Sequence, residues 1–169
     1  MNWLKFRENN SIEALGEKAL ANKLIDYCGG SRNLPIDVDR AATVLSIDVH
    51  KDSFTKSNWE SSCRFNDKEA HLWINSDYEV TYQRFCLAHQ LGHFLMHPQG
   101  EYRCKSSSRS SLETQANIFA ANLLVPLWVL EPIALNKKYN VHDIQSMFQV
   151  SGHLLNMQLF ALSGNSVQW

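Results

Sequence analysis

The chain has 169 residues, of which 44% are hydrophobic, and its formal net charge is −1. This length is enough for one domain with a substantial core, expected over residues 1–169. The near-neutral charge gives no indication of a nucleic-acid or membrane surface. We find no apolar run of secretory or membrane-spanning length. The four cysteines form no C-x-x-C pair, so we expect reduced thiols in a cytoplasmic protein.

The first half of the chain predicts two helices, a strand and a β-hairpin, from their helical and alternating patterns. In chain order these elements cover residues 11–27, 35–45, 47–50, 63–66 and 70–74. Asp37 is the expected N-cap of the second helix, and residues 75–77 (Asn-Ser-Asp) are expected to cap the helix that follows the hairpin.

The second half is more helical. Residues 99–111 are polar, and we expect them to form a mobile loop that contains Cys104. Residues 112–125 resume helical periodicity. Residues 141–163 have the rhythm of a helix-turn-helix, but no Lys or Arg follows Val141, and DNA recognition needs such cations. We therefore expect two closing helices, and the whole order predicts an α+β fold.

The most informative stretch is residues 84–97, which are apolar almost all round and predict a buried helix. His89 and His93 are four residues apart. On a helix they lie about 6 Å apart along the axis and about 40° apart around it, so both reach one ion. This is the spacing of the zinc-binding H-E-x-x-H motif. The alternative is a chance pair of histidines on an apolar helix.

Gln90 stands where that motif has its glutamate. A carboxamide can hydrogen-bond but cannot accept a proton as a general base. His97 lies about 12 Å along the axis from His89 and cannot share the same ion. We interpret it as a helix-end histidine near the C-terminal dipole, ahead of Pro98. A third ligand must come from elsewhere.

Glu113 is the first candidate for the third ligand, because carboxylates commonly complete such sites. It also fits position N3 of a capping box that begins at Ser110. Glu101 is a weaker candidate. The local sequence leaves the ligand and the cap interpretations of Glu113 open.

Over about three quarters of its length the chain resembles the ImmA/IrrE family of metallopeptidases. The matching residues are Arg84, Phe85, Leu87, Ala88, His89, Leu91, Gly92, His93, Leu95, His97, Glu113, Ala116, Asn117, Phe119, Ala120, Ala121, Leu123, Leu124 and Pro126, with 34–37, Phe148, Val150 and Ser151. The resemblance implies a zincin-like (gluzincin-like) domain, with a small antiparallel sheet on the histidine helix.

The same resemblance implies Zn²⁺ held by His89, His93 and Glu113, and an endopeptidase that cleaves a helix-turn-helix repressor. Cleavage would derepress phage, defence or stress genes. Active members carry a glutamate where this chain has Gln90, so we expect this form to be inactive or nearly so. Two explanations are open: a deliberate substitution of the general base that traps the enzyme, or a natural pseudopeptidase that binds a repressor without cutting it. A small domain with a purely structural zinc is a third alternative.

Cys104 lies between the histidine helix and Glu113, and a thiolate is a strong zinc ligand. Similar family members that regulate anti-phage defence operons are held latent by a cysteine in this region. The resemblance therefore implies a cysteine switch, with Cys104 as an inhibitory fourth ligand; the alternative is an ordinary exposed thiol. An activating nucleic acid would need a basic groove, which composition does not reveal.

We expect the substrate to bind as an added strand on an exposed sheet edge, because edge strands offer main-chain partners to a straightened peptide. The expected edge, and hence the expected substrate-binding residues, are Ala70, His71, Leu72, Trp73, Ile74 and Asn75.

Overall fold

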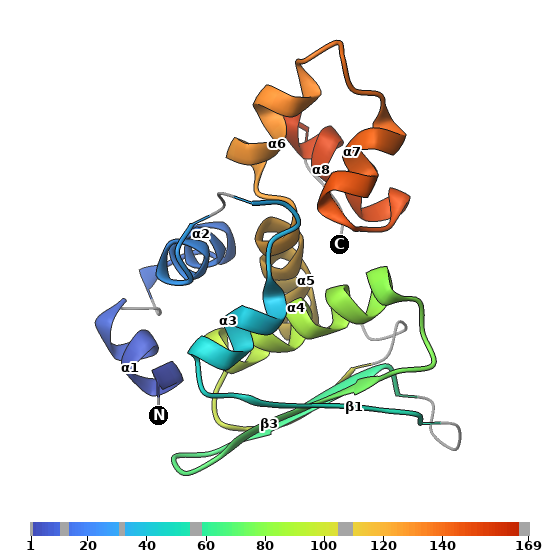
Figure 1. Ribbon diagram of the computed structural model, residues 1–169. Coiled ribbons are helices and arrows are strands. Elements are labelled where there is room, and N and C mark those ends of the chain that lie inside the picture. The colour runs from blue at the N-terminus through green and yellow to red at the C-terminus, as the bar shows by residue number, and fades with distance from the viewer. Residues whose placement is uncertain (1, 11–13, 31–32, 55–58, 105–109, 166–169) are drawn as a thin grey trace.

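The computed structural model describes residues 2–10, 14–30, 33–54, 59–104 and 110–165. Within these residues it has eight helices and four strands, an α+β architecture (Figure 1). The helices are α1 (Asn2–Asn9), α2 (Glu17–Tyr27), α3 (Val38–Val44), α4 (Val80–Met96), α5 (Ser111–Leu124), α6 (Leu127–Ala134), α7 (Val141–Phe148) and α8 (Gly152–Leu162). The strands are β1 (Asp48–Asp52), β2 (Ser61–Phe65), β3 (Ala70–Asn75) and β4 (Gly100–Cys104).

The strands form one sheet in the order β1-β3-β2-β4. The predicted hairpin is confirmed, since β2 and β3 are antiparallel neighbours. However, β3 also pairs in parallel with β1. It is therefore an inner strand, and the prediction that residues 70–75 form an exposed edge is wrong. Their assignment as substrate-binding residues loses its basis, because both backbone edges of β3 are already paired.

Helix α4 lies between the sheet and α5 (Figure 1). Residues Cys86–Leu95 are all buried, which confirms the predicted buried helix. Its N-cap is Glu79, which makes no side-chain cap bond, so the expected cap at 75–77 is wrong. The Asn75 side chain instead binds the loop before β2, through the backbone of Phe54 and Trp59. The helix ends at Met96 and His97 is its C-cap, which confirms the interpretation of His97 as a helix-end histidine.

Strand β4 replaces the first part of the predicted 99–111 loop. It pairs with β2 from Gly100 to Cys104. The cause is a period-2 pattern inside a polar stretch, since Tyr102 and Cys104 turn inward while Glu101 and Arg103 stay exposed. The Tyr102 ring stacks on the His93 ring, with centroids 4.6 Å apart. The rest of the predicted loop, residues 105–109, lies outside the described residues.

Helices α7 and α8 pack with α6 as a helical group at the far end of α5 from the sheet (Figure 1). The prediction of two closing helices is confirmed. The Gln158 amide anchors α8 to α5 by donating to the carbonyls of Ala121 and Val125. In the described part of the chain no single helix has the length and apolarity to cross a membrane. Among these residues only α5 and α6 taken together reach that length and apolarity, and the pair is bent by 50°.

Helices α4 and α5 approach each other closely at Gly92. A Cβ there would lie 3.1 Å from the Phe119 ring and 3.2 Å from the Ala116 Cα. Gly92→Ala should therefore lower the free energy of unfolding by about 1–3 kcal/mol, more than the gain in helix propensity of about 1 kcal/mol. Urea unfolding measures this. Gly152→Ala, where the nearest atom is 3.4 Å away on the Gln145 side chain, is the control and should change stability little. A fully stable Gly92→Ala protein would contradict the close approach.

Candidate metal centre

Three elements bring four metal-binding side chains together. Helix α4 supplies His89 and His93, β4 supplies Cys104, and α5 supplies Glu113. Their ligand atoms all lie within 4.8 Å of one another, and all four side chains are buried. The histidines face one direction because they are one helical turn apart. The Cys104 thiol lies beside them because β4 pairs with β2, and the Glu113 carboxylate lies there because α5 packs on α4.

The ligand atoms of the four side chains lie at distances close to those of a four-ligand metal site. The two Nε2 atoms are 3.1 Å apart. Cys104 Sγ lies 3.2 Å from His89 Nε2, 3.5 Å from His93 Nε2 and 3.7 Å from Glu113 Oε1. Glu113 Oε2 lies 3.2 Å from His89 Nε2, and Glu113 Oε1 lies 3.4 Å from His93 Nε2. A tetrahedral ion with bonds of about 2.0–2.3 Å sets its ligand atoms about 3.3–3.8 Å apart, so the cluster has the size of such a site.

Both imidazoles present a bare nitrogen to the centre of this cluster. His89 Nδ1 lies 2.8 Å from the side-chain amide oxygen of Asn117, so Nδ1 carries the proton and donates it. His97 Nε2 lies 3.2 Å from the side-chain amide oxygen of Gln115 and donates to it. Its Nδ1 therefore accepts from His93 Nδ1, at 2.8 Å. Each Nε2 is left with a lone pair, the arrangement that metal-binding histidines usually show.

Burial and charge make these donors suitable for a cation. Burial is the main reason that the pKa of His93 is lowered to about 4, so its ring is neutral. Burial, with Glu113 beside it, raises the pKa of the Cys104 thiol. A cation among these groups would reverse this preference and favour the thiolate. The donor set therefore fits a metal ion.

The backbone of Glu113 takes part in the helix cap, and its side chain faces the proposed metal centre. Its backbone N–H is capped by the Ser110 hydroxyl at 3.3 Å, as the capping interpretation expected. Its carboxylate faces the histidines instead of completing the capping box. Glu101, the weaker candidate, is exposed and pairs with Arg103. Cys104 was expected in a mobile loop as either a ligand or an exposed thiol; it ends a strand and is buried.

Gln90 is fully buried beside the cluster. Its Nε2 donates to Ser61 Oγ at 2.8 Å and to Cys104 Sγ at 2.9 Å. Its Oε1 has no hydrogen-bond partner among the described residues, which typically costs about 1–3 kcal/mol. This position is where the H-E-x-x-H motif has its general base.

The sequence interpretation did not identify Ser61, Asn117 and Gln115 as neighbours of this centre, and it gave His97 no contact with His93. Asn117 follows Glu113 by one helical turn, and that spacing on one helix face is a signal that could have identified it. Ser61 has no comparable local signal, because it reaches Gln90 only through the packing of β2 on α4.

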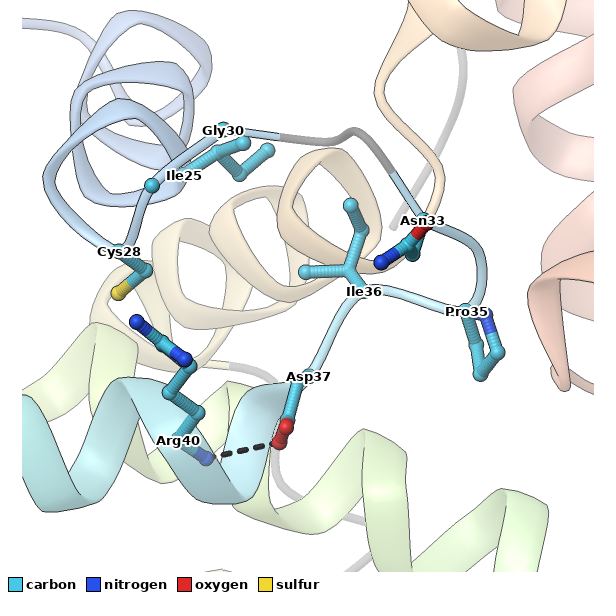
Figure 2. A pocket seen from close by; sticks show the side chains of 9 residues that line it. Ile25, Cys28, Gly30, Asn33, Pro35, Ile36, Asp37 and Arg40 are labelled. Atoms are coloured by element: carbon cyan, nitrogen blue, oxygen red, sulfur yellow. Dashed lines mark hydrogen bonds between the residues drawn. The ribbon is translucent and has the colours of Figure 1, made fainter.

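A separate cavity of about 370 Å³ is lined by residues from the end of α2 and the start of α3 (Figure 2). In this view the Arg40 guanidinium points toward the Cys28 sulfur. Burial raises the pKa of Cys28 to about 11, although Arg40 lowers it. The thiol therefore stays protonated, and this cavity contains none of the four cluster residues.

Comparison with known proteins gives two similarities. The model of a peptidase family described as the IrrE N-terminal-like domain matches residues 42–160. The uncharacterized immunity region protein 2 of Bacillus phage phi105 is 27% identical over 99 residues. That alignment covers 56% of this chain and 62% of the phage protein, so the chain spans less than two thirds of the relative it matches.

Metal content tests the cluster directly. The protein should bind about one zinc ion per chain, and His89→Ala, His93→Ala and Glu113→Ala should each lose it. Elemental analysis of the folded variants measures this. His153→Ala, which changes an exposed histidine on α8, should retain the metal. Full zinc content in folded Glu113→Ala would show that the carboxylate is not a ligand.

The hydrogen bonds that Asn117 and His97 make to the two histidines should change the affinity for the metal ion without changing the number of ions bound per chain. Replacing a residue that orients a histidine ligand typically costs about 10–100-fold in metal affinity, and we expect such a loss for Asn117→Ala and His97→Leu. Competition with a chromogenic chelator measures it. Asn122→Ala is the matched control on α5, because Asn122 bonds only the Ile118 carbonyl among the described residues. Equal affinities for Asn117→Ala and Asn122→Ala would exclude the orienting role.

Proposed function

The chain belongs to the IrrE N-terminal-like (ImmA/IrrE) family of peptidases, and on that premise we propose that it is a zinc endopeptidase directed at a helix-turn-helix transcriptional repressor. The observation that carries this proposal is the cluster of His89, His93, Glu113 and Cys104 side chains. Two histidines and one glutamate are a common protein ligand set of peptidase zinc, whereas magnesium and calcium prefer oxygen ligands.

When bound, zinc supplies Lewis-acid polarisation of a peptide carbonyl and acidification of a water molecule. The residues of the chain supply the rest. His89 and His93 would hold the metal by their bare nitrogens, oriented by Asn117 and His97. Glu113 adds the negative charge. Because Asn117 and His97 carry no part of the reaction themselves, they act as positioning residues.

Gln90 sets the expected level of activity. It lies where family peptidases have the glutamate that moves a proton from water to the leaving amine, and an amide cannot perform that transfer. General-base catalysis typically contributes about 10²–10⁴-fold. We therefore expect this form to be inactive or nearly so. Position 90 is accordingly the proposed catalytic position, and the reaction would require a glutamate there instead of Gln90.

Cys104 is the proposed restraint on the site. Its sulfur lies within 3.7 Å of a ligand atom from each of the other three residues. A catalytic zinc keeps one position for water, and a closed four-ligand zinc is structural. With Cys104 as fourth ligand, the centre is closed and the enzyme is latent.

The proposed substrate class rests on family membership and on the phage relative. That relative is named as an immunity region protein, and this supports a partner in repressor control. A repressor substrate and four unpaired cysteines agree with the cytoplasm as the expected compartment. An activating nucleic acid stays a prediction from the family resemblance.

A second candidate function is a pseudopeptidase that captures the repressor without cutting it. One observation favours it: Gln90 is hydrogen-bonded within the cluster and contacts the fourth ligand. In this function the metal stabilises a binding domain, and no catalytic water is required.

Cleavage separates the two functions. The double variant Gln90→Glu, Cys104→Ala restores the base and opens the fourth position, so it should cut the regulator encoded beside its gene at a rate at least about 10²-fold above the unchanged protein. Product appearance by mass spectrometry measures the rate at matched zinc content. Adding His93→Ala is the control and should abolish cleavage. Capture of the intact regulator by a zinc-loaded double variant would favour the pseudopeptidase instead.

A further inference from the structure

The Gln90 amide, at the position of the general base, contacts Cys104, the proposed fourth ligand. Its Nε2 lies 2.9 Å from Cys104 Sγ and 2.8 Å from Ser61 Oγ. The side chain is fully buried, and no partner for Oε1 lies among the described residues. The amide thus directs both N–H groups at the sulfur and the hydroxyl, and leaves its carbonyl unpaired to do so.

This orientation suits a metal-bound thiolate better than the reversed amide would. A metal-bound thiolate has only lone pairs toward its neighbours, so an N–H donor satisfies it, and hydrogen bonds to charged acceptors are the stronger ones. The reversed amide would place Oε1 against the sulfur. That arrangement requires a sulfur that keeps its proton, which a metal ligand does not.

A glutamate at position 90 would act in the opposite sense. An ionised carboxylate only accepts hydrogen bonds, so at the position of the amide it would set a second anion about 3 Å from the thiolate. The Glu113 carboxylate is already 3.7 Å from the same sulfur. Like charges this close in a buried site disfavour each other, so glutamate would favour release of Cys104 from the metal.

We propose that Gln90 is a positioning residue that holds the Cys104 thiolate on the metal, with Ser61 as the anchor of its amide. Residues 90 and 104 are then a matched pair: glutamine with a bound cysteine makes a closed centre, and glutamate favours an open one. The inference rests on the metal centre of the proposed function and deepens it, since it makes the glutamine part of the latency device rather than only the loss of a base.

Cobalt substitution tests the pair by spectroscopy, without any need for activity. Thiolate ligation gives cobalt a sulfur-to-metal charge-transfer absorption. The unchanged protein should show this band, and Cys104→Ala should lack it. Gln90→Glu should bind cobalt but lose most of the band. Gln158→Glu is the matched control, because Gln158 is an equally buried glutamine that bonds the backbone of α5 and its C-cap; its band should equal that of the unchanged protein.

Alkylation of Cys104 in the zinc-loaded protein gives a second readout. Mapping by mass spectrometry follows Cys104 separately from buried Cys63, which serves as the internal reference for unfolding. Loss of a charged hydrogen bond typically changes an equilibrium by about ten-fold or more. Cys104 should therefore react at least about ten-fold faster in Gln90→Glu, with Cys63 unchanged.

The outcomes distinguish the inference from the function on which it rests. An undiminished band and unchanged Cys104 reactivity in Gln90→Glu would overturn the inference alone. Cobalt binding by the unchanged protein without a sulfur band would also overturn it, while leaving a three-ligand zinc peptidase in place. Failure to bind any metal would overturn both. If Gln90→Glu does not fold, Gln90→Met and Ser61→Ala decide, since each weakens the N–H contact without a new charge; a full band in both would overturn the inference.

Discussion

The structure depends on the convergence of four electron-pair donors at one buried point. Two bare imidazole nitrogens, a carboxylate and a sulfur lie within 4.8 Å of one another. Without a cation such a group is unfavourable, because each lone pair faces another and burial removes the water that would separate them. The surrounding elements hold this convergence. Helices α4 and α5 meet at Gly92, where α5 lies too close for a side chain, and the sheet carries Cys104 in from the other side.

The chemistry of the centre depends on whether its fourth position is open. Zinc with three protein ligands leaves room for a water molecule, whereas four protein ligands give a closed site. In this chain the Gln90 amide lies beside Cys104, the candidate for that fourth position. It contacts the Cys104 sulfur and occupies the position that the H-E-x-x-H motif gives to its general base. In the proposed function this residue would therefore bear on both proton transfer and access to the metal.

The sequence predicted elements whose pattern is local, and it failed for strands whose place in the sheet depends on pairing with another strand. The hairpin of β2 and β3, the Asp37 cap of α3 and the buried α4 were predicted and are found. Strand β4 was not predicted, because its alternating inward residues lie within a polar stretch and matter only once β2 lies beside them. The expected edge at β3 was wrong for a similar reason. A parallel partner such as β1 leaves no turn signal in the sequence to announce the pairing.

The sequence by itself determined that the His89 and His93 side chains would face the same point, because two residues one helical turn apart share a face whatever surrounds the helix. It also placed Gln90 at the position of the general base. Only the tertiary structure showed that the Glu113 carboxylate turns toward the histidines while Ser110 caps its backbone. Only the tertiary structure brought Cys104, Asn117 and Ser61 to the same centre. Helical periodicity relates side chains over a few residues, whereas donors from α4, α5, β2 and β4 meet only after the helices pack and the strands pair.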